Sequence, residues 1–150
     1  MSRFVFHALC LPLLLLAGCQ SLHAPAEPGL VGTIWRVKDF QGQPFSAPDN
    51  ASASYTLQLG ADGHLAAFAG CNELQGDYQH KGRVLRISPQ LVTHHDCGEA
   101  AMKLERALIR AMEGGSDYVL SEQVLSLRNP IGITLISFQP DTAAQKSAMP

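Results

Sequence analysis

The chain has 150 residues, of which 16% are charged, and its formal net charge is −2. This length suits one domain with a hydrophobic core and is too short for two domains of ordinary size. A nearly neutral chain without basic clusters excludes a surface built for the phosphates of nucleic acid. We therefore expect a single domain that does not bind nucleic acid.

The first 18 residues have the pattern of a secretory signal peptide. Arg3 supplies the positive charge, and a leucine-rich apolar stretch follows from Phe4 to Leu16. This stretch is shorter than the roughly 20 residues that a membrane-spanning helix needs. It ends at Leu16-Ala17-Gly18-Cys19, which resembles the lipobox of bacterial lipoprotein precursors. The alternative is an ordinary secretory peptide with a chance cysteine at the cleavage point.

The lipobox resemblance implies a lipid on Cys19 and cleavage of the chain before it. Acyl chains such as palmitate would then anchor the protein in a membrane, because each buried methylene contributes about 0.8 kcal/mol. Gln20 stands where an aspartate would favour the inner membrane. We expect an outer-membrane protein that faces the periplasm, with residues 19–31 as the lipidated N-terminus and tether.

Two cysteines remain in the mature chain, because Cys10 leaves with the signal peptide and Cys19 carries lipid. These are Cys71 and Cys97. The periplasm is oxidising, so a pair of thiols there usually forms a structural disulfide. We predict a Cys71–Cys97 disulfide, with two free thiols as the alternative.

The mature chain is dominated by short segments in which apolar and polar residues alternate. Turn signals such as Asp62-Gly63 and Lys81-Gly82 separate them. The pattern predicts about eight strands in an antiparallel meander. The predicted strands are 33–37, 55–59, 64–68, 77–80, 84–87, 118–120, 124–127 and 134–138.

One segment, Glu99–Glu113, has helical periodicity instead. Its apolar residues form a single stripe that must be buried against the sheet, so the fold class is α+β. Asp96 with Glu99 fits a capping box at the start, and Gly114-Gly115 ends the helix. Residues 140–150 are small and polar and are predicted to be a disordered tail.

Several short motifs together resemble the META domain family, also called HslJ-like. They are Gly70-Cys71-Asn72, then Gly76-x-Tyr78, then Thr93 four residues before Cys97, and Glu105 eight residues after Cys97. The resemblance assigns residues 32–139 to this domain. It implies a mostly antiparallel β half-barrel with one helix packed across it. The sequence departs from the family at His94, His95 and Asp96, where basic and apolar residues are usual.

The resemblance also implies a function class. Members of the family are periplasmic lipoproteins linked to heat shock and antibiotic tolerance, without an established catalytic activity. We expect a monomer with a non-enzymatic binding or structural role, no cofactor and no catalytic residue. The partner would be an envelope protein or a small apolar ligand held in the half-barrel. An interior filled by Phe68, Leu85 and Leu127 would argue against the apolar ligand.

Metal binding is a second hypothesis. His94, His95, Asp96 and Cys97 are consecutive ligand types, and His80 and Cys71 could join them if they lie near. Adjacent residues of an extended segment point in opposite directions, so one site could use about two of the four. The alternative is an exposed polar loop before the helix.

Thiol chemistry is a third hypothesis. Cys97 would lie in the first turn of the helix, where the helix dipole lowers a thiol pKa, with His94 or His95 as the base. The sequence has no Cys-x-x-Cys and no Gly-x-Ser-x-Gly motif. A disulfide at Cys97 would remove the nucleophile.

Overall fold

A computed structural model describes residues 29–48 and 55–147 of the chain. The predicted signal peptide, the lipidation site Cys19 and most of the tether lie outside the described residues. Within the described ranges, no helix is long and apolar enough to cross a membrane.

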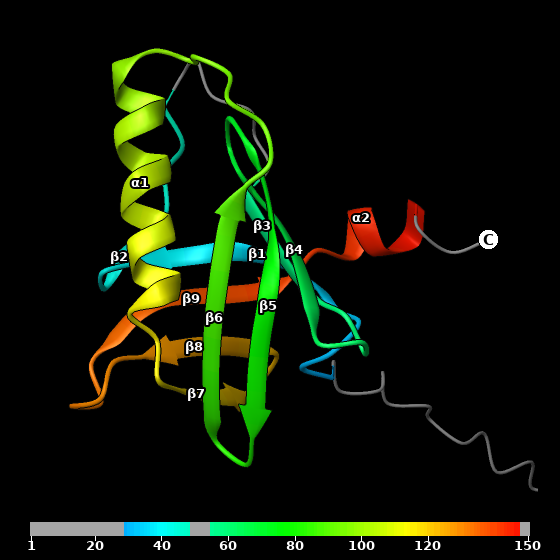
Figure 1. The fold of residues 1–150 in the computed structure, drawn as a ribbon. Helices are drawn as coiled ribbons and strands as arrows, with labels where there is room; N and C mark the ends of the chain where they lie inside the picture. Colours follow the sequence, from blue (N-terminus) through cyan, green and yellow to red (C-terminus); the bar gives the residue numbers. More distant parts are fainter. Residues whose placement is uncertain (1–28, 49–54, 148–150) are drawn as a thin grey trace, which may run out of the picture.

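The described residues form a nine-stranded antiparallel sheet that curls into a ring, with two helices (Figure 1). The strand order is β2-β1-β3-β4-β5-β6-β7-β8-β9, and β1 also pairs with β9, which joins the two ends of the sheet. The strands are β1 (Ile34–Phe40), β2 (Gln43–Pro44), β3 (Tyr55–Leu59), β4 (His64–Ala69), β5 (Glu73–Lys81), β6 (Val84–Leu91), β7 (Asp117–Ser121), β8 (Val124–Arg128) and β9 (Thr134–Pro140). The helices are α1 (Glu99–Glu113) and α2 (Thr142–Ser147). The predicted α+β half-barrel is confirmed.

Alternation along each strand separates the core from the outer face. In β3, Tyr55, Leu57 and Leu59 are buried, whereas Thr56 is half-buried and Gln58 is exposed. The other fully buried large side chains include Trp35, Leu74, Leu85, Leu125, Leu127, Ile136 and Phe138. These side chains occupy the interior of the ring, which argues against the expected apolar ligand inside it.

Of the three residues considered as possible fillers of the interior, Leu85 and Leu127 lie in it and Phe68 does not. Its neighbours Ala67 and Ala69 in β4 are buried, so alternation places Phe68 on the outer face, half-buried. The interior accepts the small alanines of β4, and the larger phenylalanine covers the outside of the sheet.

Helix α1 lies beside β6, where the sheet is held most weakly (Figure 1). Strands β6 and β7 share a single residue pair, Val84 with Asp117. The buried face of α1 carries Ala101, Leu108 and Met112. Packing of the helix therefore compensates for the small number of strand hydrogen bonds at this point.

The predicted cap of α1 is wrong, although the predicted bounds of the helix are confirmed. The residue before the first turn is Gly98, with φ 85°, and no side chain caps the helix. Asp96 lies two residues further back, where its Oδ1 accepts a hydrogen bond from the Gly98 N–H at 2.9 Å. Cys97 consequently lies before the helix and not in its first turn. At the other end, the helix stops at Gly114 as predicted.

Strand β5 begins at Glu73, four residues before its predicted start. The turn before it is made by Gly70, whose φ is 87°. Gly76, the next glycine of the motif, lies inside β5, opposite Pro89 of β6. A Cβ at Gly76 would collide with the carbonyl oxygen of Ser88. Glycine is required at position 76 because the two strand backbones approach closely there.

The predicted disorder of the tail is wrong for residues 142–147, which form α2. Asp141 Oδ1 accepts a hydrogen bond from the Ala144 N–H at 3.1 Å, as an N-cap residue does. The two-residue strand β2 is also absent from the prediction, because it is too short to show alternation.

Gly76→Ala should lower the free energy of unfolding by roughly 1–3 kcal/mol, the usual cost of an extra methyl in close-packed structure. The clash is with backbone, so β6 must move to relieve it. Urea unfolding can be followed through Trp35, the only tryptophan, which is fully buried. Gln79→Ala, at an exposed position on the same strand, is the control. Equal stability of the two variants would contradict the close-approach argument.

Asp117, which forms the one residue pair between β6 and β7, also contacts two arginines: Arg128 links it to β8, and Arg83 links it to the turn before β6. Arg128 donates two hydrogen bonds to Asp117, from Nε to Oδ1 at 2.9 Å and from Nη2 to Oδ2 at 2.6 Å. Arg83, between β5 and β6, lies 3.6 Å from Asp117 Oδ2. The hydrogen bonds from Arg128, aided by the nearby charges, lower the pKa of the Asp117 carboxyl below its ordinary value of 3.8.

Asp117→Asn should reduce stability at neutral pH but not in strong acid. Because the folded state lowers the pKa of Asp117, its contribution is fully present above pH 3.8 and is lost as the pH falls through the lowered pKa. Thermal unfolding from pH 7 to pH 2 should show the melting temperatures of wild type and variant converging in acid. Glu113→Gln, at an exposed position on α1, is the control. A difference that persists at pH 2 would rule out the carboxylate as the cause.

Candidate functional site

The motif residues Asn72 and Thr93 meet Glu105 in one buried cluster beside the disulfide, which we call the Asn72 cluster. The Asn72 side chain is central to it. Its Oδ1 accepts hydrogen bonds from Thr93 Oγ1 at 3.0 Å and from the His95 N–H at 2.6 Å. Its Nδ2 donates to the His95 carbonyl at 3.2 Å. Asn72 lies in the bend between β4 and β5 and is not in a left-handed conformation.

Glu105 reaches this cluster from α1 and is fully buried. Its Oε2 accepts a hydrogen bond from the Asn72 N–H at 2.9 Å, and its Oε1 accepts one from Asn72 Nδ2 at 3.2 Å. Both carboxylate oxygens therefore have a donor, as a buried acidic group requires. The arrangement fixes α1 to the turn between β4 and β5.

The predicted disulfide between Cys71 and Cys97 is present next to this cluster, with a Cα–Cα distance of 5.9 Å. It joins residues 26 apart in sequence. On the chain-entropy model, closing a loop of that length stabilises the fold by about 3.5 kcal/mol. The disulfide and the Asn72 cluster hold the same segment, residues 93–97, against the β4–β5 turn.

Gly70 and Tyr55 complete the surroundings of the cluster. A Cβ at Gly70 would collide with the Tyr55 ring, so the ring occupies the space that the glycine leaves. Burial raises the pKa of the Tyr55 hydroxyl, and nearby Glu105 raises it further. The hydroxyl has no hydrogen-bond partner among the described residues.

The motif residues Gly76 and Tyr78 lie elsewhere, along β5. The Tyr78 hydroxyl donates a hydrogen bond to the Gly60 carbonyl at 2.6 Å. The family motif therefore marks two structural devices, the Asn72 cluster and the close contact between β5 and its neighbours.

The residues of the metal hypothesis are not brought together. His94, His95 and Asp96 are exposed, and Cys97 is half-buried with its sulfur in the disulfide. His80 lies near β7, where its Nε2 is 3.1 Å from the Tyr118 hydroxyl. In residues 29–48 and 55–147, no three His, Cys, Asp or Glu side chains are placed to hold a metal ion. The disulfide also contains the sulfur of Cys97, which the hypothesis of thiol chemistry needs as a nucleophile.

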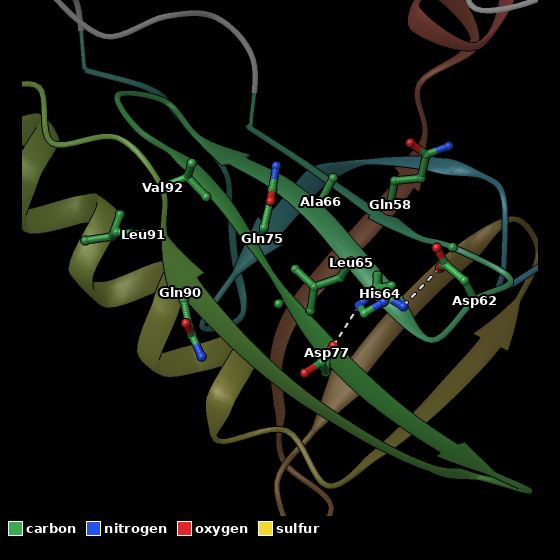
Figure 2. A pocket seen from close by; sticks show the side chains of 12 residues that line it. Gln58, Asp62, His64, Leu65, Ala66, Gln75, Asp77, Gln90, Leu91 and Val92 are labelled. Atoms are coloured by element: carbon green, nitrogen blue, oxygen red, sulfur yellow. Dashed lines mark hydrogen bonds and ion pairs between the residues drawn. The ribbon is translucent and has the colours of Figure 1, made fainter.

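A groove of about 720 Å³ opens on the outer face of β3 to β6 (Figure 2). We call it the outer groove. Twelve residues line it: Gln58, Gly60, Asp62, His64, Leu65, Ala66, Gln75, Gly76, Asp77, Gln90, Leu91 and Val92. Its volume lies in the range of small-molecule sites. We did not predict it from the sequence.

Three glutamines cross the outer groove in one line, which we call the amide row. Strand register pairs Gln58 with Ala66, Ala66 with Gln75, and Gln75 with Gln90. Paired residues share one face of a sheet, so the three amides and the small alanine form a straight strip across four strands. Figure 2 shows the three amides coming from β3, β5 and β6.

A charged group lies at one side of this strip. His64 Nδ1 is 2.7 Å from Asp77 Oδ1, and both side chains are well exposed. Asp62 Oδ1 accepts a hydrogen bond from the His64 N–H at 3.1 Å. These contacts are visible in Figure 2 as dashed lines. The residues lining the outer groove include no serine, threonine or cysteine that the His64–Asp77 pair could activate as a nucleophile.

A second groove, of about 370 Å³, continues the first on the other side of the amide row. The two share Gln58, Ala66 and Gln75, and the second adds Phe68 and Glu73. The outer face of β3 to β5 is thus one hollowed strip with an aromatic ring at one end and a His–Asp pair at the other.

Asn72→Ala should lower the free energy of unfolding by roughly 3 kcal/mol. It removes a donor from Glu105 and the acceptor of Thr93 and the His95 N–H, and unpaired buried groups are costly. Chemical unfolding measures the change, with the exposed Gln79→Ala as the control. Adding Glu105→Gln should cost much less than it does alone, because the two residues share their bonds. Full additivity would mean that they do not form one cluster.

Comparison with known proteins agrees with this geometry. The sequence profile of the META domain matches residues 28–142. A protein from Burkholderia xenovorans, solved by NMR, is 24% identical with a TM-score of 0.58, over 75% of this chain and 84% of that one. The crystal structure of a DUF4847 family protein from Bacteroides vulgatus is 17% identical with a TM-score of 0.55, over 73% and 93%. These two likenesses show the fold alone.

No curated protein matches the chain. The profile match covers most of the chain and closely follows the predicted limits, residues 32 and 139. It includes the Asn72 cluster, the disulfide and the strands of the outer groove. The chain belongs to the META domain family.

Proposed function

We propose that this protein is a lipid-anchored module of the bacterial cell envelope that acts by binding and not by catalysis. The proposal rests on the bonds that the motif side chains make within the fold. Asn72 bonds to both Thr93 and Glu105, and Cys71 bonds to Cys97. These motif side chains hold the fold together, and the outer groove is left as the surface for a partner.

The signal sequence supports the anchor. Leu16-Ala17-Gly18-Cys19 offers a thiol for lipid, and Gln20 favours the outer membrane, facing the periplasm. A disulfide of this kind suits an oxidising compartment. The family's association with heat shock and antibiotic tolerance supports a role under envelope stress. In this proposal the protein acts as a monomer and needs no cofactor.

The intact mass of protein extracted from membranes tests the anchor. We expect a chain that begins at Cys19 and carries acyl chains, with two thiols that react with an alkylating reagent only after reduction. Cys19→Ser should give an unlipidated protein that no longer sediments with membranes. A wild-type mass without lipid would overturn the anchor.

A second variant tests the membrane. Gln20→Asp changes only the residue after the lipidated cysteine, so lipid should remain while the protein moves from the outer-membrane to the inner-membrane fraction. Gln20→Asn is the matched control and should stay in the outer membrane. Equal distribution of all three proteins would contradict sorting by position 20.

A further inference from the structure

We propose that the outer groove binds an uncharged oligosaccharide laid across strands β3 to β6, along the amide row. This inference rests on the binding role proposed above and names the chemical class of the ligand. It depends on three properties of the two grooves: their charge, the spacing of their polar groups and the apolar surface between them.

The charge excludes acidic ligands. The residues lining the two grooves include no lysine or arginine. Four carboxylates stand around them: Asp62, Glu73, Asp77 and Asp141. These carboxylates would repel a phosphate, a sulfate or an acidic sugar, whereas a hydroxyl group can donate a hydrogen bond to a carboxylate.

The amide row suits a ligand rich in hydroxyl groups. Each glutamine amide offers donors and an acceptor, and each sugar hydroxyl is both a donor and an acceptor. Gln75 and Gln90 make no side-chain hydrogen bond with the other described residues, so their amides are free for a ligand. Gln58 makes one long bond, from Nε2 to the Gly32 carbonyl at 3.3 Å.

The spacing of the row argues against an extended peptide. Neighbouring strands lie about 4.8 Å apart, whereas an extended peptide repeats every 3.3–3.4 Å. The polar groups of a peptide laid along the row would therefore not match the positions of the amides on β3, β5 and β6. A short glycan carries hydroxyls along both edges of each ring and can place them at many positions along this line.

The apolar part of the strip suits the C–H faces of sugar rings. Ala66 lies between Gln58 and Gln75 and leaves the centre of the strip open. Phe68, two residues from Ala66 along β4, provides a half-buried aromatic surface beside the amide row, and Val92, with 48% of its surface exposed, lies at the rim. A sugar ring can place its apolar face on such a surface while its hydroxyls reach the amides.

Calorimetric titration of the full chain tests the proposal. The protein is purified from membranes in a detergent without a sugar headgroup, since such a headgroup would compete. The probes are neutral tetrasaccharides of glucose and of N-acetylglucosamine, with spermine as a cationic probe for the carboxylates. We expect at least one tetrasaccharide to bind, and to bind more tightly than spermine.

Three variants locate the site. Ala66→Phe fills the centre of the strip and should abolish binding, whereas Gln75→Leu and Gln90→Leu should each weaken it about tenfold, the usual effect of one lost hydrogen bond to a ligand. Gln79→Leu makes the same change at an exposed position of β5 outside both grooves and should leave binding unchanged. Melting temperatures near that of the wild type would show that the variants are folded.

The outcomes separate this inference from the proposed function. Binding of spermine but of no tetrasaccharide, or tetrasaccharide binding that survives Ala66→Phe, would overturn the oligosaccharide site and leave the anchored binding module untouched. Release of new reducing ends during the titration would support the ligand class and overturn the non-enzymatic role. Absence of lipid on Cys19 would affect only the proposed location.

Discussion

The bond between Asn72 and Glu105 is the contact on which the rest of the fold depends. Glu105 has no exposed surface, and a buried carboxylate is tolerated only when its oxygens have donors. Asn72 supplies a donor to each oxygen and at the same time binds Thr93 and the backbone of His95. One residue thus ties the β4–β5 turn, the segment before α1 and α1 itself into a single unit. The disulfide joins the same two segments. The fold is therefore stabilised there in two ways, by hydrogen bonds in the folded state and by the lower entropy of the cross-linked unfolded chain.

That unit matters because the sheet alone does not close firmly. Strands β6 and β7 share one residue pair, and α1 packs beside this seam. The helix can cover the seam only if its position is fixed, and Glu105, near its middle, fixes it. Asp117 adds a smaller constraint through Arg128 and Arg83. The fold is therefore a ring that is closed by strand pairing at β1 and β9 and by a docked helix at β6 and β7.

Local patterns predict the strands and α1, because alternation and helical periodicity depend on residues near in sequence. The disulfide is predicted from a different signal: two cysteines remain in the mature chain, and the signal peptide implies an oxidising compartment. Other contacts between distant segments could not be predicted from the sequence. Asn72 resembles a turn residue, and nothing in its neighbourhood shows that its partner is Glu105, 33 residues away. Phe68 is apolar and could by its type fill the interior, but the register of β4 places it on the outer face. The amide row exists only because four strands pair in a particular register. The sequence shows the three glutamines, but it does not show which residues of the neighbouring strands lie opposite them.

The interior of the ring is filled with side chains, and the motif residues hold the fold together, so neither offers a binding surface. A barrel that binds a ligand inside must leave space between its strands, but here Trp35, Leu85 and Phe138 are fully buried within the ring. Recognition must then use the outer surface. On that surface the sheet presents uncharged amides in line and places carboxylates around them, with no lysine or arginine among the lining residues. Such a surface repels acidic polymers and offers many weak, interchangeable hydrogen bonds, and these properties suit a neutral glycan better than a ligand recognised through one charged group.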